Sequence, residues 1–242
     1  MKIALISDIH ANLEALEAVL KDCESQKVEA VHCLGDVVGY GADPGLCLEL
    51  INERCKIRLL GNHEYAALGL LPTDLLNQVA RSSLTWTHDQ LTDRHFAIIA
   101  EFTLEMIEND LHLVHASPFE PDKWHYILTQ TEAKEAFAHV RTRLCFLGHS
   151  HLPAIFGENS DGSVRQQVGH DFLPDEECRY LINVGSVGQP RDNDPRACYV
   201  TCDTSEGDIE YHRVEYDIAR ARAKMAQARL PQMLIDRLEV GR

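Results

Sequence analysis

Aspartate, asparagine and histidine side chains gather in short clusters along this chain, and each cluster directly follows a run of β-forming residues. The members of these clusters are Asp8, His10, Asp36, Asn62, His63, His115, His149 and His151. Alone, each cluster is a weak signal, because a triplet such as Asp-x-His is common by chance. Asp and His side chains that are buried together need either ionic partners or a metal ion. Their recurrence after successive strands is therefore hard to explain by packing alone.

The types of side chain indicate which metals would bind. Imidazoles, carboxylates and a single amide oxygen suit borderline transition-metal ions better than calcium. We therefore predict two divalent ions, drawn from Mn, Fe, Zn, Ni and Co, with Asp36 bridging them. The seven predicted ligands are Asp8, His10, Asp36, Asn62, His115, His149 and His151. Two such ions about 3.5–4 Å apart hold a hydroxide between them and stabilise both oxygens of an in-line phosphoryl displacement, which predicts phosphate-ester hydrolysis.

The charge of the chain limits its substrates. The sequence has 38 acidic and 23 basic residues, a formal net charge of −15, and no basic run. Binding to long DNA or RNA depends on Lys and Arg, so a long nucleic-acid partner is disfavoured. A phosphate substrate needs a local positive centre, which bound divalent metals would supply.

Composition predicts an ordinary globular protein of the cytoplasm. Of the 242 residues, 45% are apolar and 25% are charged, which is enough to build one sizeable core. No apolar run approaches the ~18 residues of a membrane span, and residues 1–6 are too short for a signal peptide. The eight cysteines form no Cys-x-x-Cys pair and are interpreted as buried, reduced thiols. Nothing in the sequence predicts an oligomeric state.

Strands are expected to position the clusters. β-rich runs cover residues 2–7, 28–34, 57–60, 111–115 and 144–147, and helix-forming stretches follow several of them. The first helix is expected to start after Asn12, whose side chain can cap it. Alternating strands and helices are typical of an α/β sheet with parallel neighbours. Ligand sites in such sheets form at the carboxyl ends of the strands, where each cluster lies.

The rest of the chain is expected to complete a single domain, residues 1–242. Residues 65–108 are interpreted as a helical insertion broken by Pro72. Five short candidate strands, separated by turn-forming residues, predict a second, antiparallel sheet. They cover residues 154–156, 164–168, 180–184, 197–202 and 209–214. The strong helix formers of residues 218–229 predict a C-terminal helix that stops before Pro231.

Taken together, the clusters resemble the motifs of the calcineurin-like metallophosphoesterase superfamily. The matching blocks span residues 3 to about 151 and read Asp8-x-His10, Gly35-Asp36, Gly61-Asn62-His63-Glu64, His115 and Gly148-His149-x-His151. A later segment, Asn-Val-Gly-Ser-Val-Gly-Gln-Pro-Arg at residues 183–191, resembles the small bacterial phosphodiesterase branch of that superfamily. This branch includes asymmetric diadenosine tetraphosphate hydrolases.

The resemblance implies a fold and a set of residue roles. The fold would be α/β (α+β), a four-layer αββα sandwich of two mixed β-sheets flanked by helices. One metal would bind Asp8, His10, Asp36 and His151, and the other Asp36, Asn62, His115 and His149. His63 would be the catalytic histidine, which protonates or stabilises the leaving oxygen.

One departure from the superfamily's motifs narrows the substrate. Its protein Ser/Thr phosphatases read Gly-Asp-x-Val-Asp-Arg-Gly after the second block, whereas residues 35–41 here read Gly-Asp-Val-Val-Gly-Tyr-Gly. The phosphate-binding Arg is missing, which disfavours a protein phosphatase. Arg191 is a candidate for binding the substrate phosphate, since guanidinium binds phosphate through two hydrogen bonds, but an ion pair would equally explain it. Tyr40 would either stack on a base or pack in the protein.

We therefore predict a dinuclear metal-dependent hydrolase of a small phosphodiester or nucleotide, with diadenosine tetraphosphate as one candidate. His63 would assist the leaving group, and Asn62 and Arg191 would contact the substrate. The alternative is a non-catalytic interaction scaffold, since some relatives keep the fold without the catalytic His. Asn62 and His63 are both present here, which favours the enzyme.

Overall fold

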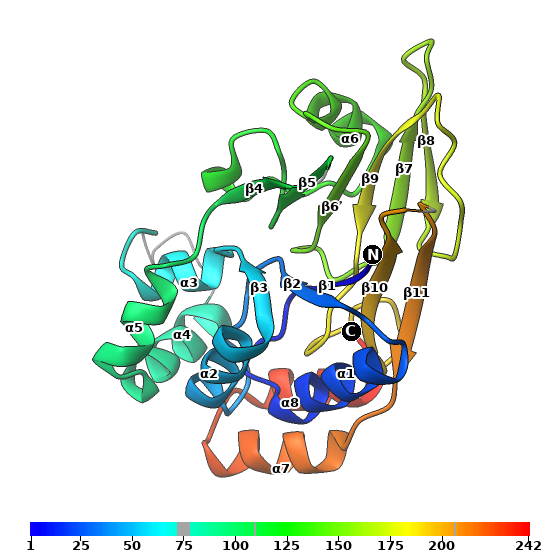
Figure 1. Cartoon of the computed structure of the whole chain (residues 1–242). Helices are drawn as coiled ribbons and strands as arrows, with labels where there is room; N and C mark the ends of the chain where they lie inside the picture. Colours follow the sequence, from blue (N-terminus) through cyan, green and yellow to red (C-terminus); the bar gives the residue numbers. More distant parts are fainter. Residues whose placement is uncertain (72–77, 109, 206) are drawn as a thin grey trace.

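Two β-sheets lie face to face, with helices on both outer sides, in the computed structural model of the chain (Figure 1). The structure describes residues 1–71, 78–108, 110–205 and 207–242. Apolar side chains from both sheets, among them Leu5, Leu113 and Phe146, form one buried cluster between them. The predicted sandwich of two mixed sheets flanked by helices is confirmed.

The first sheet has five strands in the order β11-β10-β1-β2-β3. Its strands are β1 (Lys2–Ile6), β2 (Ala30–Cys33), β3 (Cys55–Arg58), β10 (Ala197–Asp203) and β11 (Ile209–Val214). β1, β2 and β3 run parallel, connected by α1 (Leu13–Ser25) and α2 (Pro44–Arg54). As predicted, the Asn12 side chain caps α1, accepting a hydrogen bond from the Ala15 backbone. The carboxyl ends of three parallel strands therefore meet at one edge.

The second sheet has six strands in the order β4-β5-β6-β9-β7-β8. Its strands are β4 (Glu105–Glu108), β5 (Leu111–Val114), β6 (Leu144–Leu147), β7 (Ala154–Glu158), β8 (Val164–Val168) and β9 (Arg179–Asn183). β5, β6 and β9 run parallel, and the other pairs are antiparallel. β5 and β6 thus end at a common edge as well.

The prediction that the five later strands form their own antiparallel sheet was wrong. β7, β8 and β9 belong to the second sheet, whereas β10 pairs with β1 and β11 pairs with β10 in the first. β9 is parallel to β6. β10 is buried along nearly its whole length, as a strand with neighbours on both edges and both faces must be. Spacing along the chain predicts where strands lie but not which sheet they join.

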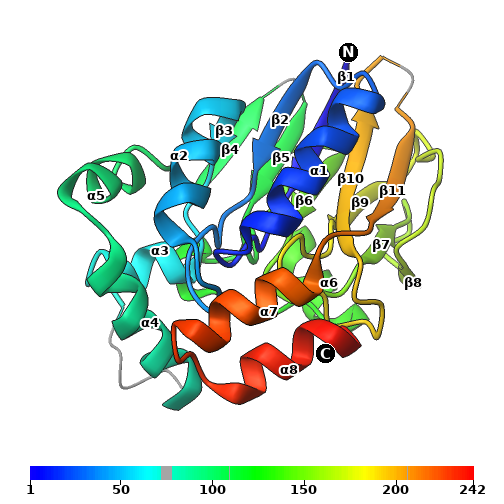
Figure 2. The ribbon, with the colours of Figure 1, turned by 90° about the horizontal axis from the view of Figure 1, so that it is seen from below.

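Helices cover the outer face of each sheet. α1 and α2 pack on the first sheet, and α6 (Gln130–Phe137) packs on the second. A short 3-10 turn at Pro121–Lys123 precedes α6 in the chain. α7 (Ile218–Gln227) and α8 (Gln232–Val240) lie side by side near α1 (Figure 2). The stretch predicted as the C-terminal helix forms α7, which ends before Pro231. A second helix, α8, follows Pro231 and was not predicted.

The predicted helical insertion is only partly helical. α3 (Asn62–Ala67), α4 (Gln78–Gln90) and α5 (Asp93–Ile99) lie in or beside it, and residues 72–77 lie outside the described residues. Its last part was predicted wrongly, because Glu105–Glu108 forms β4 and pairs with β5. The Met106 side chain packs against the cluster between the sheets, which favours the strand over a helix. None of the helices in the described part of the chain combines the length and apolar character needed to cross a bilayer.

The cluster between the sheets predicts a large stability effect. Phe146, at 0% exposure on β6, belongs to it. We expect Phe146→Ala to lower the free energy of unfolding by about 3–5 kcal/mol, because it removes buried contacts and leaves a cavity. Urea denaturation measures the effect. Met233→Ala on α8, where the side chain is 54% exposed, is the control and should stay within about 0.5 kcal/mol of the parent protein. Equal losses in the two variants would contradict this placement of the core.

Candidate metal centre and active site

The loops that follow β1 and β2 are joined by backbone hydrogen bonds. Asp8 N donates to Gly35 O at 3.0 Å, and His10 N donates to Asp36 O at 2.9 Å. In the second sheet, the backbone nitrogen of Gly148, after β6, donates to the backbone oxygen of His115, after β5, at 2.8 Å. The sheets therefore bring the predicted clusters together at one edge, although the clusters are far apart in sequence.

Five of the predicted ligands have a backbone conformation that most residues avoid. Their φ angles are positive: Asp8 (+54°), His10 (+47°), Asp36 (+53°), His149 (+65°) and His151 (+60°). Left-handed φ at a non-glycine residue costs about 1–3 kcal/mol and persists only where the surroundings impose it. Its repetition here indicates that the loops are shaped to aim these side chains inward.

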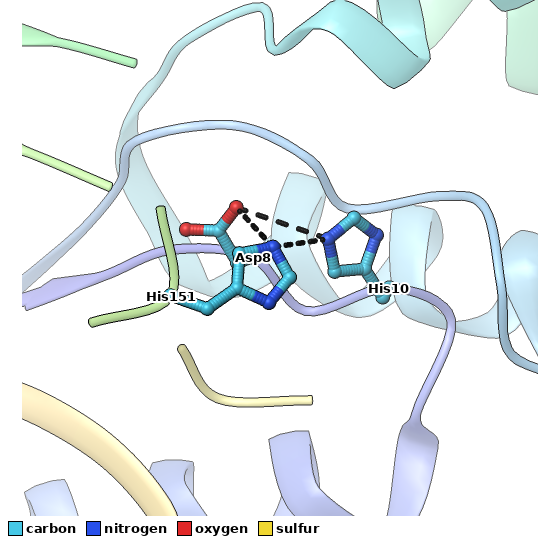
Figure 3. A group of neighbouring side chains, drawn as sticks. All are labelled: Asp8, His10 and His151. Carbon is cyan, nitrogen blue, oxygen red and sulfur yellow. Dashed lines mark hydrogen bonds and ion pairs between the residues drawn. The ribbon is translucent and has the colours of Figure 1, made fainter. Parts of the chain in front are cut away.

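Three groups of side chains lie close enough to hold metal ions, their ligand atoms within 4.8 Å of one another in each group. In the first, Asp8 Oδ1 lies 3.2 Å from His151 Nε2 and 3.8 Å from His10 Nε2 (Figure 3). The two Nε2 atoms are 3.1 Å apart. The other groups combine Asp36 with His115 and His149, and with His10 and His63. Asp36 belongs to the second and the third of these groups.

Asp36 lies between the ligand groups. Its Oδ2 atom is 3.3 Å from His115 Nε2 and 3.7 Å from His10 Nε2. Its Oδ1 atom accepts a hydrogen bond from His63 N at 2.9 Å. Burial raises the pKa of Asp36, but the His115 charge and the other nearby imidazoles lower it well below its usual range, so the side chain is a carboxylate. The position fits a bridging ligand.

Backbone carbonyls fix the hydrogens of the imidazoles. Nδ1 of His10 faces Val38 O at 3.2 Å, and Nδ1 of His151 faces Gln189 O at 2.6 Å. Because a carbonyl only accepts, each Nδ1 carries the hydrogen. Burial lowers the pKa of both histidines, so both rings are neutral and each Nε2 presents a lone pair. Two lone pairs then face the Asp8 carboxylate, an arrangement that a cation stabilises.

The second group has a similar arrangement. Nδ1 of His115 faces Leu34 O at 2.9 Å, which directs Nε2 toward Asp36. Burial lowers the pKa of His115, but the Asp36 carboxylate raises it more, to about 9. Burial and the His115 charge lower the pKa of His149 to about 3. The proton on His115 Nε2 therefore lies between the imidazole and Asp36, in the position that a bound metal ion would take instead.

Two buried oxygen atoms that accept no hydrogen bond among the described residues also fit a metal site. Asp8 Oδ1 and Asn62 Oδ1 are buried and accept no hydrogen bond from any residue that the structure describes. Asn62 is the first residue of α3, directly after the loop that contains Gly61. A buried acceptor without a donor is costly unless a water or an ion binds it. The oxygen and nitrogen donors therefore suit transition-metal ions.

His63 lies beside the ligand groups and is fully buried. Its ring centroid is 4.8 Å from that of His10 and 4.5 Å from that of Tyr40. Nδ1 of His63 makes no hydrogen bond within the described residues. Burial, opposed by the Asp36 charge, lowers the pKa of His63. Tyr40 therefore packs on two site histidines. Of the two roles considered for Tyr40, this is packing within the protein.

Gly39 leaves room for the His63 ring, which predicts the effect of a substitution. A Cβ at Gly39 (φ +87°) would lie 2.0 Å from His63 Nδ1, whereas one at Gly69 (φ +74°) would meet nothing within 4 Å. Alanine at either position strains the backbone by about 1–2 kcal/mol. We expect only Gly39→Ala to lower kcat at constant metal content, because only it displaces His63. Equal losses of kcat in the Gly69→Ala control would contradict this reason.

Glu64 is a functional residue that the sequence analysis did not identify. Its buried carboxylate accepts hydrogen bonds from three backbone nitrogens, Asp36 N at 2.8 Å, Gly61 N at 2.9 Å and Val38 N at 2.9 Å. Burial, together with the Asp36 charge, raises its pKa to about 7. Glu64 is thus a positioning residue that holds the loop after β2 against α3. Its place at the third residue of a helix that starts after Gly61 is a capping signal that would have found it.

Arg191 lies at the rim of the site. Its Nη2 atom donates to Gln189 Oε1 at 3.0 Å, and its backbone nitrogen donates to His151 O at 3.3 Å. No carboxylate of the described residues lies within 4.0 Å of the Arg191 guanidinium. Among these residues, a structural ion pair therefore does not explain Arg191.

Tyr126 is another residue that the sequence analysis did not identify. It stacks on His149 with 4.1 Å between ring centroids. No local pattern marks Tyr126, because its partner is far along the chain.

Comparisons with known proteins agree with this geometry. A model of the calcineurin-like phosphoesterase superfamily domain matches residues 1–207. An uncharacterized protein of Methanocaldococcus jannaschii is 39% identical over 244 residues, which cover 99% of this chain and 98% of that protein. The crystal structure of a metallophosphoesterase from Sphaerobacter thermophilus is 41% identical with a TM-score of 0.88, covering 100% of this chain and 99% of that one.

A more distant structure shares the fold. A hypothetical protein from Pyrococcus horikoshii OT3 has a TM-score of 0.81 at 16% identity, with 100% of this chain and 98% of that chain covered. The family match spans every predicted metal ligand and His63 as well as Arg191. The chain belongs to the calcineurin-like phosphoesterase superfamily and is a phosphoric ester hydrolase.

Proposed function

We propose that the protein is a dinuclear metal-dependent phosphoesterase that hydrolyses a small phosphodiester or a nucleotide. The observation that carries the proposal is the arrangement around Asp8 and Asp36. The neutral imidazoles of His10 and His151, fixed by their Nδ1 hydrogen bonds, present lone pairs to the Asp8 carboxylate inside the protein, and Asp36 lies beside them. Only cations make such a buried concentration of acceptors favourable.

Each metal would have four ligands, with Asp36 shared. The first set is Asp8, His10, Asp36 and His151, and the second is Asp36, Asn62, His115 and His149. Mn, Fe, Zn, Ni and Co all suit these donors. When bound, two divalent ions supply positive charge to the phosphate oxygens and lower the pKa of a coordinated water.

The protein's own residues would position the substrate and assist the leaving group. In hydrolysis a water oxygen forms a bond to phosphorus while the bond to the leaving oxygen breaks. His63 would assist that leaving oxygen, by protonating it or by donating a hydrogen bond to it, supported by its buried position against His10 and Tyr40. Arg191 would bind a phosphate oxygen of the substrate through its guanidinium. Asn62 would also contact the substrate.

A small substrate agrees with the charge of the chain. A formal net charge of −15 opposes binding of long DNA or RNA, so the attraction for phosphate must come from the site itself. Diadenosine tetraphosphate remains our leading candidate among nucleotides. All eight cysteines are free, which supports the predicted cytoplasmic location.

Metal removal tests the proposal. We expect about two ions per chain by elemental analysis, and turnover of bis-p-nitrophenyl phosphate that a chelator abolishes and Mn restores. Metal at 100-fold excess over its Kd should also stabilise the fold by about 2.7 kcal/mol. Absence of bound metal and of turnover with each of the five candidate ions would refute the phosphoesterase and favour a scaffold.

A further inference from the structure

Two guanidinium groups converge on one oxygen atom beside the candidate metal centre. Arg191 Nη2 and Arg237 Nη1 each donate to Gln189 Oε1, both at 3.0 Å. Arg191 follows β9, whereas Arg237 belongs to α8 near the end of the chain. The shared acceptor is a neutral amide, so it balances neither positive charge.

This pair is directly connected to the predicted metal ligands. The backbone oxygen of Gln189, whose side chain joins the arginines, accepts the hydrogen bond from His151 Nδ1 at 2.6 Å. The backbone nitrogen of Arg191 also donates to the backbone oxygen of His151 at 3.3 Å. The positive charges therefore lie at the edge of the site.

Neither charge has an anionic partner in the described residues. Other arginines at comparable depth pair with carboxylates, as Arg213 does with Asp192 and Arg179 with Glu158. No described carboxylate lies within 4.0 Å of either Arg191 or Arg237.

Further donors are available on both side chains. The Nε atoms of Arg191 and Arg237 are buried and find no acceptor among the described residues. Two nearby like charges with unused donors are unfavourable in the free protein, and a bound anion with several oxygens removes that cost. A phosphate group has the charge and the oxygens that this pair lacks.

We propose that Arg191 and Arg237 form a subsite for a second phosphate group, which makes compounds with linked phosphates, such as nucleoside and dinucleoside polyphosphates, the substrate class. The inference rests on the proposed phosphoesterase function and specifies its substrate. α8 lies beyond residue 207, where the family match ends. The C-terminal helices therefore add a contact that the matched domain does not itself provide.

Binding of inorganic tripolyphosphate to the metal-free, full-length protein tests the subsite without turnover. Isothermal titration calorimetry should show a Kd at least about tenfold weaker for Arg237→Gln, because it removes charge-assisted hydrogen bonds. Arg237→Lys, which keeps the charge but not the planar donors, should lose less. Arg220→Gln on α7, which removes an equal charge from a 65% exposed side chain, is the matched control and should bind as the parent protein does.

Turnover gives the second readout. The ratio of kcat/KM for diadenosine tetraphosphate to that for bis-p-nitrophenyl phosphate should fall at least about tenfold in Arg237→Gln and not in Arg220→Gln. Equal tripolyphosphate affinity in these two variants, or no binding by the parent protein, would overturn the subsite. An equal fall in kcat/KM for both substrates would place Arg237 on the scissile phosphate and overturn it too. If the parent protein hydrolyses no ester but binds tripolyphosphate through Arg237, the phosphoesterase proposal fails and the subsite stands.

Discussion

Replacing His63 with alanine is expected to lower kcat by about 10²–10⁴-fold while the metal content stays the same. The variant loses the imidazole that would donate to the leaving oxygen. The hydrogen bond to Asp36 Oδ1 comes from the His63 backbone nitrogen, so alanine can keep it. The proposed bridging carboxylate therefore stays in place. Steady-state kinetics and elemental analysis of the same preparation measure the two quantities.

The leaving group distinguishes this role from a structural one. p-Nitrophenolate leaves readily without a proton, so esters with an alkyl leaving group should lose more activity in His63→Ala than p-nitrophenyl esters do. His88→Ala, on a 60% exposed side chain, is the matched control and should change neither substrate's kcat. An equal loss for both kinds of leaving group would remove His63 from the protonation step.

Asp36→Asn is expected to reduce metal binding and to lower kcat/KM at least about 100-fold. Asparagine has nearly the same size and tolerates the left-handed φ of +53° found at Asp36. The substitution therefore removes the negative charge and one metal-binding oxygen with little change in backbone conformation. Thermal unfolding with and without Mn measures the consequence, because only a protein that binds the ion is stabilised by it.

The control for Asp36→Asn is Asp89→Asn, which neutralises a 72% exposed carboxylate. It should retain two ions, full activity and the whole stabilisation by Mn. If Asp36→Asn also retained two ions and full stabilisation, Asp36 could not be the shared ligand. The two metals would then be held independently.

The strand ends and the polar side chains that follow them could be predicted because local patterns encode them. The β-rich run before Asp8 and the glycine-containing turn before Asn62 are visible within a few residues. Partners of β9 and β10 are not encoded locally, since similar buried strands fit either sheet. Arg237 and Tyr126 were missed for the same reason: they meet Gln189 and His149 only after the chain has folded. No spacing rule relates such residues.

The backbone hydrogen bonds between the site loops have a consequence for how the protein would acquire the proposed metals. Asp8 N and His10 N are held by carbonyls of the loop after β2, and Asp8 Oδ2 accepts from His149 N at 2.9 Å. These bonds involve no metal ion, so the ligands are ordered before one arrives. Uptake then costs little conformational entropy, in contrast to small domains that fold around their zinc. We therefore expect the proposed divalent ions to exchange in a finished fold, so that their supply would select among them.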